Sequence, residues 1–347
     1  MDNSGTLVIV LSRNYSTGLG VIRSLGSAGY TVDLIASTKK SGSSIIPASS
    51  KYVRHSVEVL SQKIQGDDGA EIIAEILKYK DKGEQKPVLF PADDFTASIV
   101  ASNLDKLNDS FLMPTVVGDY PSNLNEAMDK SVQAELAKFV GLYTPQEWII
   151  DLRNEITIPK EMIYPCFVKP LQSISGTKSE MAVVNNSKEL KAHLESMKNF
   201  YSNRDVIVQE LLRISKEYDI SGVCLDQKVI VPAVIEKTRI SKHEPGVTMS
   251  GRILSIDTLG DAKDKVIELL KRLRYIGMFD MELTLCDGRI YFNEINLRSG
   301  GPNYSYQLSG VNLPDIFVKE ITGKGHKKCE EQISAFGKTF VYEKVAW

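Results

Sequence analysis

The sequence predicts a mixed protein of the α/β and α+β classes, in which a parallel α/β unit comes first and antiparallel hairpins follow. An apolar run over residues 6–11, a helical pattern from Gly18 to Ala28 and a second strand over residues 31–36 predict a βαβ unit. Farther along, residues 218–237 and 277–298 each contain two strand-like runs joined by a short turn. A chain of 347 residues is long enough for two or three domains.

Composition and charge exclude several classes of function. The net charge of −2 and the pI of about 6.2 do not indicate a basic surface that would bind a nucleic acid. Its four cysteines lack the spacing of a zinc site or a disulfide framework, which favours a reducing compartment. The N-terminus does not read as a signal peptide, and no apolar run approaches the roughly 18 residues of a membrane span. We therefore expect a cytoplasmic protein without nucleic-acid or membrane partners, with a homodimer as the default assembly.

The hairpin over residues 277–302 carries polar side chains where a buried strand should be apolar. Glu282 lies on its first strand. Three polar residues of the second strand share one face because they follow at every second position: Glu294, Asn296 and Arg298. Two carboxylates and an amide oxygen suit Mg²⁺, which also bridges substrate phosphates, and an arginine suits the charge on a transferred phosphoryl group. The alternative is an exposed edge hairpin with an ordinary ion pair.

Whether Glu282 joins that face depends on the turn at residues 286–288. A two-residue loop would put Glu282 and Glu294 on opposite faces, whereas a three-residue loop with Gly288 in the left-handed region would put them on the same face. We expect the three-residue loop, because it assembles two carboxylates, an amide and a guanidinium at one end of the hairpin.

A lysine inside an apolar strand is a second sign of a phosphate site. Lys169 lies in the strand predicted over residues 164–170, and a lone buried ammonium is costly unless it has a partner such as a phosphate. The small, polar residues 171–179 precede another strand, an arrangement that can fold a hairpin over phosphates with its backbone N–H groups. The sequence contains no Walker motif.

The first half of the chain leaves alternatives open. Gly18 and Gly20 match part of a dinucleotide fingerprint, but no acidic residue closes the second strand, so we expect them to serve a tight turn. Asp93 and Asp94 follow a strand, where they either cap a helix or face a ligand. Residues 126–140 are expected to form one helix.

Taken in order, the motifs of this chain resemble those of the ATP-grasp superfamily over roughly residues 120–323. The matching motifs are Met128-Asp129-Lys130, Tyr164-Pro-Cys-Phe-Val-Lys169-Pro, Val208-Gln209-Glu210-Leu-Leu, Glu217, Glu282 and Glu294-Ile-Asn296-Leu-Arg298. The continuation Leu297-Arg-Ser-Gly-Gly-Pro302 and residues 309–314 look most like the carboxylate–amine ligases, such as D-aspartate ligase-like proteins.

The resemblance implies a Rossmann-like N-terminal domain over residues 1–118, followed by an ATP-grasp fold. In that fold, a linker helix and a small lid subdomain would occupy residues 119–208. A larger subdomain with an antiparallel sheet, the metal-binding hairpin and a C-terminal tail would occupy residues 209–347.

The resemblance also implies which residues bind ATP. Lys130 and Lys169 would hold its phosphates, and Glu217 would accept hydrogen bonds from the ribose. The segment at the adenine edge would be Gln209, Glu210, Leu211 and Leu212. The loop over the phosphates would contribute Ser173, Ser175 and Gly176, although it has one glycine where many relatives have several.

The same resemblance assigns Mg²⁺, with Mn²⁺ as an alternative, to Glu282, Glu294 and Asn296. Arg298 and Lys169 would act in catalysis, with Arg298 holding an acyl phosphate and stabilising the tetrahedral intermediate. Substrate contacts are expected from five residues: Arg239, Arg252, Ser299, Gly300 and Gly301. The two arginines lie in strand-like stretches, where they either clamp a substrate carboxylate or are simply exposed.

The implied activity is that of an ATP-dependent carboxylate–amine ligase, which forms an amide or peptide bond through an acyl phosphate on an amino acid or small peptide. Within the superfamily, the alternatives are bicarbonate-using carboxyphosphate chemistry and phosphoryl transfer without ligation. From other classes, the alternatives are a nucleotide-binding regulatory protein without turnover and a nicotinamide oxidoreductase built on the βαβ unit.

Overall fold

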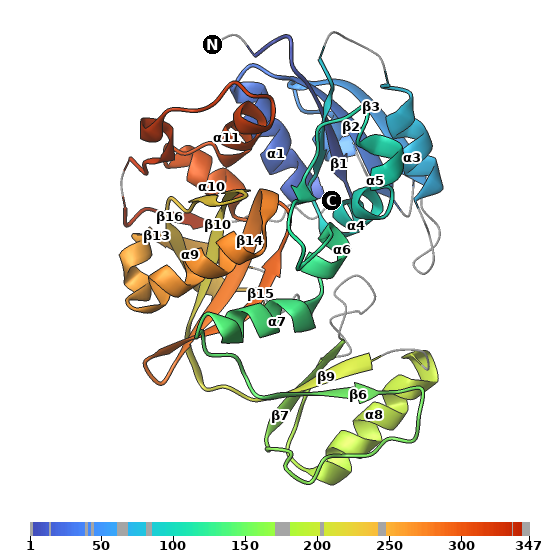
Figure 1. Ribbon diagram of the computed structural model, residues 1–347, viewed down its shortest axis with the longest axis vertical. Helices are drawn as coiled ribbons and strands as arrows, with labels where there is room; N and C mark the ends of the chain where they lie inside the picture. The colour runs from blue at the N-terminus through green and yellow to red at the C-terminus, as the bar shows by residue number, and fades with distance from the viewer. Residues whose placement is uncertain are drawn as a thin grey trace.

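The computed structural model describes residues 3–13, 15–38, 41–42, 45–60, 69–80, 85–170, 181–201, 205–241, 248–334 and 336–341. In this part of the chain the strands form three sheets, which Figure 1 shows one above another. The N-terminal sheet lies at the top, the largest sheet in the middle and the smallest at the bottom. None of the described helices is long and apolar enough to cross a bilayer.

The N-terminal sheet is parallel and has the order β3-β2-β1-β4. Its strands are β1 (Leu7–Ser12), β2 (Thr31–Thr38), β3 (Val53–Leu60) and β4 (Val88–Pro91). The helices of this part are α1 (Tyr15–Ser27), α2 (Ile45–Ala48), α3 (Ala70–Leu77), α4 (Asp94–Ser102) and α5 (Leu104–Leu107). Both faces of the sheet are covered, which is why β1 reads as a continuous apolar run. The βαβ unit expected at the start of the chain is confirmed.

The largest sheet is antiparallel, with the order β15-β14-β10-β12-β13-β16 and with β11 and β5 paired to it off this path. Its strands are β5 (Thr115–Val116), β10 (Ile214–Leu225), β11 (Lys228–Ile230), β12 (Val234–Ile240), β13 (Thr248–Leu254), β14 (Tyr275–Cys286), β15 (Arg289–Asn296) and β16 (Thr339–Val341). The helices of this part are α6 (Leu124–Ala127), α7 (Lys130–Phe139), α9 (Ala262–Arg272), α10 (Asn303–Leu308) and α11 (Leu313–Ile321), with 3-10 turns η2 (Ile256–Leu259) and η3 (Lys328–Glu331).

The smallest sheet is also antiparallel and has the order β6-β9-β7-β8. Its elements are β6 (Glu147–Asp151), β7 (Cys166–Pro170), β8 (Ala182–Val184), β9 (Asp205–Glu210) and the helix α8 (Ser187–Tyr201). Leu190 and Leu194 of α8 share an apolar cluster with Val168 and Val208 of the sheet. Because side chains alternate along a strand, Lys169 lies on the face away from α8.

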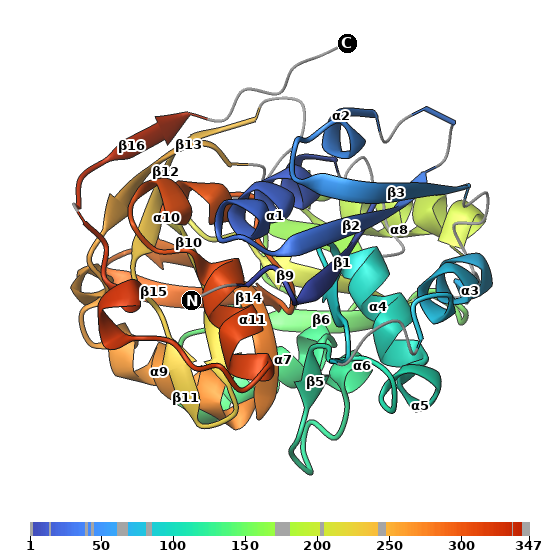
Figure 2. The ribbon, with the colours of Figure 1, turned by 90° about the horizontal axis from the view of Figure 1, so that it is seen from above.

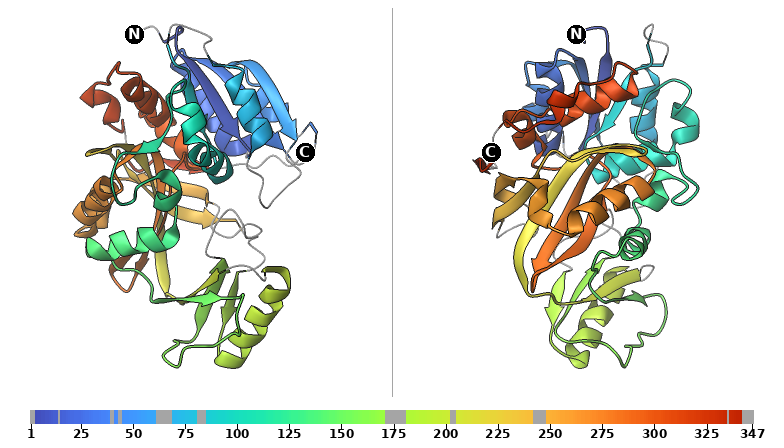
Figure 3. Two further views of the ribbon diagram at one scale, coloured as in Figure 1. Left: turned by 45° about the vertical axis from the view of Figure 1, so that its right-hand side comes forward. Right: turned by 60° about the vertical axis from the view of Figure 1, so that its left-hand side comes forward.

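One apolar cluster joins the N-terminal sheet to the largest sheet. It contains Val10 of β1, Phe317 of α11 and Met278 of β14, and the rings of Phe90 and Phe317 meet edge to face at 5.7 Å. Figure 2 shows α1 and α11 between these two sheets, while Figure 3 shows the smallest sheet and α8 at the far end of the molecule. The largest sheet buries its other face against α7 and α9.

Candidate active site

Two glutamates face each other across the two strands at one edge of the largest sheet. Glu282 on β14 is the direct cross-strand partner of Glu294 on β15, and two residues away Asp280 is the partner of Asn296. Directly opposed residues of an antiparallel pair project from the same face, so all four side chains lie on one side of the sheet. The prediction that Glu282 and Glu294 share a face is confirmed.

The predicted reason for that arrangement is wrong. Cys286 pairs with Arg289, which leaves a two-residue turn in which Asp287 and Gly288 have φ values of 48° and 74°. The register is shifted farther along the hairpin, where Glu282 pairs with Glu294 and Leu283 with Phe292. The residue left over, Asn293, is a β-bulge, and this extra residue brings the two glutamates to the same face.

Lys130 reaches Glu294 from the start of α7. Its Nζ lies 2.7 Å from Oε2 of Glu294. The single helix expected over residues 126–140 is interrupted at Asp129, whose carboxylate caps α7 by accepting the N–H of Ser131 at 2.8 Å. One turn later, the buried amide of Gln133 donates to the carbonyl of Ile295 at 2.7 Å and accepts its N–H at 2.9 Å. The cap and this double hydrogen bond fix Lys130 beside β15.

The pKa values of Glu294 and Lys169 are both lowered at this site. Burial raises the pKa of Glu294, but the charge and hydrogen bond of Lys130, followed by Lys169 and Arg298, outweigh it and lower this pKa to about 2. Burial and the charge of Lys130 lower the pKa of Lys169 to about 8, although nearby glutamates oppose the shift. The surroundings of Lys169 thus disfavour its ammonium form, which a bound phosphate would stabilise.

A lysine that the sequence reasoning missed completes the polar face. The side chain of Lys237 on β12 is 1% exposed, and its Nζ lies 3.0 Å from Asp219, 3.1 Å from Glu282 and 3.7 Å from Glu217. Burial raises the pKa of Asp219 to about 6 and that of Glu282 to about 7, even though Lys237 opposes both shifts. Glu217, expected at the ribose, thus lies within reach of the same ammonium group.

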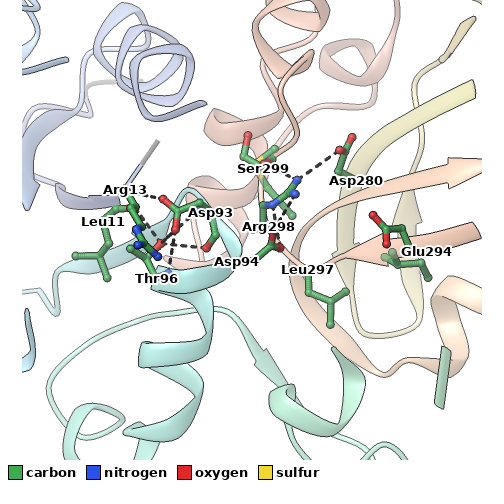
Figure 4. A network of polar contacts seen from close by, with 12 residues as sticks. Leu11, Arg13, Asp93, Asp94, Thr96, Asp280, Glu294, Leu297, Arg298 and Ser299 are labelled. Carbon is green, nitrogen blue, oxygen red and sulfur yellow. Dashed lines mark hydrogen bonds and ion pairs between the residues drawn. The ribbon is translucent and has the colours of Figure 1, made fainter. Parts of the chain in front are cut away.

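Arg298 is held by two carboxylates from different parts of the chain. Its Nε and Nη2 each donate to Asp94 at 3.1 Å, and its Nη1 donates to Asp280 at 3.4 Å and to the carbonyl of Ser299 at 3.2 Å. Figure 4 shows this network. Asp93 caps α4 through the N–H of Thr96 at 3.0 Å. Of the two aspartates, one is therefore the cap and the other faces the site.

The three residues after Arg298 have different surroundings. Ser299 is fully buried, and its Oγ has no hydrogen-bond partner among the described residues. At Gly300 an added Cβ would lie 2.2 to 2.6 Å from atoms of the Asp280 carboxylate, whereas at Gly301 it would meet nothing within 4 Å. Only glycine at position 300 lets the chain pass this close to Asp280.

The segment expected at the adenine edge ends β9 and leaves the smallest sheet. Gln209 donates to Glu147 at 3.1 Å, and the side chain of Glu210 accepts the N–H of Gln146 at 3.0 Å. Leu211, which follows, is exposed. Gln209, Glu210, Leu211 and Leu212 therefore run from the end of the smallest sheet toward β10 of the largest one.

The remaining predicted residues are not all brought to this face. Arg252 is exposed and donates to Glu236 at 3.0 Å, and Glu236 in turn pairs with Tyr218. These side chains project from the opposite face to Asp219, so the structure does not bring Arg252 to the carboxylates. Arg239 is exposed beyond an irregularity in the register of β12 and β13. The expected phosphate-loop residues Ser173, Ser175 and Gly176 lie outside the described residues.

The oxygen donors on this face fit a hard divalent cation only in part. Among the described residues, no three His, Cys, Asp or Glu side chains are arranged to hold a metal ion by themselves. Glu282 and Glu294, with Asn296 two residues on, supply two carboxylates and an amide oxygen. This set suits Mg²⁺, which keeps several waters and takes further oxygens from substrate phosphates.

Three buried charged residues of this face were missed by sequence reasoning, and the sequence pattern could have identified one of them. Of Asp219, Lys237 and Asp280, only Asp280 lies in a mostly apolar strand, which is the pattern that singled out Lys169. The strands of Asp219 and Lys237 contain several other polar residues. The burial of the three residues, at 3%, 9% and 5% of the residue surface exposed, requires partners. Which residues those partners are depends on the order of strands in the sheet.

Comparisons with known proteins identify the domain to which the two antiparallel sheets belong. A family model described as the ATP-grasp domain matches residues 135–301. The C-terminal section of the carbamoyl phosphate synthase large chain from Methanocaldococcus jannaschii is 24% identical over 271 residues, which cover 77% of this chain and 42% of that protein. The same section from Aquifex aeolicus is 25% identical over 215 residues, covering 60% of this chain and 40% of the relative. The chain thus spans about two fifths of the length of these relatives.

Solved structures share the fold over nearly the whole chain. An L-amino acid ligase from Bacillus licheniformis has a TM-score of 0.67 at 16% identity, covering 95% of this chain and 77% of that one. An N5-carboxyaminoimidazole synthetase from Staphylococcus aureus, complexed with ADP, has a TM-score of 0.68 at 14% identity, covering 98% and 82%. The predicted fold class, a parallel N-terminal unit followed by a small and a large antiparallel part, is confirmed.

Proposed function

Residues 135–301 form an ATP-grasp domain, and from this premise we propose that the chain is an ATP-dependent carboxylate–amine ligase. The observation that carries the proposal is the pairing of Glu282 with Glu294 on the face that also presents Lys130 and Arg298. Such a face combines cation ligands with positive groups for phosphates, which phosphoryl transfer requires.

The nucleotide would lie between the smallest and the largest sheet. Lys130 and Lys169 would hold its phosphates, and Glu217 would accept hydrogen bonds from the ribose. The adenine edge would meet the segment from Gln209 to Leu212. An ADP complex of the Staphylococcus aureus synthetase, a structure of the same fold, supports ATP as the nucleotide.

Glu282, Glu294 and Asn296 would hold Mg²⁺, with Mn²⁺ as an alternative. When bound, the ion would neutralise charge on the transferred phosphoryl group and fix its orientation. Lys130 already pairs with Glu294, and Lys237 with Glu282, so both glutamates have a cationic partner before an ion enters. The cation would therefore replace part of an existing positive field.

The reaction would proceed in two steps. A carboxylate oxygen of the substrate attacks the γ-phosphorus of ATP, and the bond to the β,γ-bridging oxygen breaks to give an acyl phosphate and ADP. An amine then attacks the acyl carbon, the tetrahedral intermediate expels phosphate, and the amine loses a proton to leave an amide. Arg298 would stabilise the negative charge of the acyl phosphate and of the intermediate. The protein would contribute by positioning the reacting groups and by the charges that surround them.

A second candidate uses bicarbonate as the carboxylate, so that the activated species is carboxyphosphate. The curated relatives are sections of carbamoyl phosphate synthase, and solved structures of similar fold are N5-carboxyaminoimidazole synthetases. The phosphoryl-transfer residues would have the same roles in this candidate, and only the carboxylate substrate would differ.

A coupled ADP-release assay over pairs of carboxylates and amines, with bicarbonate as one carboxylate, tests the proposal. We expect ADP release that requires both substrates, and a loss of roughly a hundredfold or more in Glu294→Gln and Arg298→Ala. Glu268→Gln, which removes an exposed pair with Arg272 on α9, is the matched control and should retain full activity. Turnover that survives the loss of Glu294 and Arg298 would refute the site. Release with bicarbonate alone would favour the second candidate.

Three further expectations stay predictions. These are the domain boundaries at residues 118 and 208, the cytoplasmic location and the homodimeric state. The contacts of Ser299, Gly300 and Gly301 with a substrate are likewise proposed from their place beside Arg298. For Arg239 and Arg252, exposure favours the simpler interpretation of solvated strand arginines.

A further inference from the structure

The guanidinium of Arg298 is almost fully engaged with the protein itself. A guanidinium has five N–H donors. Nε and Nη2 donate to the two oxygens of Asp94, and Nη1 donates to Asp280 and to the carbonyl of Ser299. Among the described residues, this leaves one N–H of Nη2 for any other group. Yet the role proposed for Arg298 requires it to hold two oxygens of an acyl phosphate, which calls for two parallel donors.

One of the two carboxylates must therefore leave, and their surroundings decide which. The side chain of Asp280 is 8% exposed, accepts a hydrogen bond from Ser221 at 2.8 Å, and lies directly against Gly300. It is thus restrained by more contacts than Asp94.

Asp94 has fewer restraints. Its side chain is 27% exposed, and it occupies the first position of α4. The cap of that helix is supplied by Asp93, which forms a capping box with Thr96, so α4 does not depend on the Asp94 carboxylate. Asp94 also occupies the edge of Arg298 that an anionic ligand would need. Nε and Nη2 are two parallel donors, which match the two oxygens of a carboxylate or a phosphate.

We infer that Asp94 competes with the oxygens of the reacting substrate for the Nε–Nη2 edge of Arg298, and that it yields when an acyl phosphate or phosphate group binds there. The inference rests on the proposed function, since it takes Arg298 as the residue that holds the acyl phosphate. It assigns to the N-terminal unit a residue that sets the affinity of the site for its anionic ligand. Asp94 lies 204 positions before Arg298 in the chain, so the same contact joins α4 to the segment that follows β15.

Binding of inorganic phosphate in the presence of MgADP tests this inference, because these are the phosphate-containing products of the proposed reaction. Isothermal titration should give a dissociation constant for phosphate that is about tenfold lower in Asp94→Asn than in the natural protein, roughly the effect of one charged hydrogen bond. Asp105→Asn, which also removes a carboxylate from the first turn of a neighbouring helix, should leave the constant unchanged. In the ADP-release assay, Asp94→Asn should lower the KM for the carboxylate substrate and change kcat little.

The double variant Asp94→Asn/Arg298→Ala shows whether the gain acts through Arg298. We expect it to bind phosphate as weakly as Arg298→Ala alone, so that the two changes are not additive. Equal or weaker phosphate binding in Asp94→Asn, with its melting temperature maintained, would overturn the inference. So would a fall in kcat with KM unchanged, which would make Asp94 a positioning residue instead. If Arg298→Ala alone left phosphate binding unchanged, the failure would lie in the proposed function.

Discussion

Nζ of Lys130 lies 2.7 Å from Oε2 of Glu294, and this ion pair sets the electrostatic environment of a second lysine. The pKa of Lys169 falls to about 8 because of burial and because of the charge of Lys130, against the opposing charge of Glu294. Lys169 therefore changes its charge close to neutral pH, unlike a solvated lysine with a pKa near ~10.4.

The affinity for ADP should consequently depend on pH. Phosphate groups bind the protonated form of Lys169 and raise its pKa, so affinity should be constant below about pH 7.5 and should fall above pH 8, approaching tenfold per unit. Titration calorimetry between pH 6.5 and 9.5 measures this slope. Lys169→Arg, whose guanidinium stays charged throughout, should flatten it. An unchanged slope in this variant would mean that another group is responsible.

The glycine pair after Ser299 offers a steric test of the site. Gly300→Ala should push the Asp280 carboxylate away from Arg298, because the added Cβ would lie within 2.6 Å of it, and ADP release should fall at least tenfold. Gly301→Ala is the matched control, since its Cβ would meet nothing within 4 Å, and it should retain activity. Steady-state ADP release and melting temperature for both variants check the prediction. Comparable activity in the two variants would contradict the proposed importance of Asp280 for Arg298.

Local sequence patterns predict the strands of this site, but they do not predict which residues pair across two strands. Alternation along β15 was enough to place Glu294 and Asn296 on one face, since it depends only on the period of a strand. The bulge at Asn293 carries no distinctive local pattern, and without a bulge only a three-residue turn would bring Glu282 and Glu294 to the same face.

Contacts between segments that are distant in the sequence are even harder to predict. Lys237 finds its partners because β10 lies between β12 and β14, an order that the sequence of any one strand does not reveal. Asp94 meets Arg298 across 204 positions for a similar reason, since their contact depends on how the N-terminal sheet packs on the largest one. In both cases the partner lies on an element that the sequence around the charged residue does not identify.

Binding of Mg²⁺ should become stronger as the pH rises from 6 to 8. Burial raises the pKa of Glu282 to about 7, so at pH 6 a proton competes with the cation for this carboxylate. The Mg²⁺ concentration that gives half-maximal ADP release should fall across this range, and Glu282→Gln should require far more Mg²⁺ at every pH. EDTA should abolish activity in the natural protein. A half-maximal concentration that is independent of pH would remove Glu282 from the ligand set.

The buried ammonium of Lys237 should contribute more to the free energy of unfolding at high pH than at low pH. Lys237→Met leaves Asp219 and Glu282 buried without their common partner, which should lower the free energy of unfolding by about 3 to 5 kcal/mol at pH 8. Both carboxyls already have folded-state pKa values above their ordinary range, about 6 and about 7, and without Lys237 these should rise further. A carboxyl with a raised pKa takes up a proton in the folded state as the pH falls, so the loss should shrink toward pH 5.

Urea unfolding of Lys237→Met at pH 5, 6.5 and 8 measures this trend. Lys216→Met is the matched control, because it removes an exposed lysine that pairs with Glu236 on the opposite face of the sheet. Its effect should stay below about 1 kcal/mol. Because the pKa of Glu236 is lowered, first by its hydrogen bond from Lys216, any small loss in the control should be fully present above the ordinary pKa range of a glutamate and should change little between pH 5 and pH 8. If Lys237→Met lowered the free energy of unfolding equally at pH 5 and pH 8, protonation of the two buried carboxyls would not contribute to the stability of the sheet.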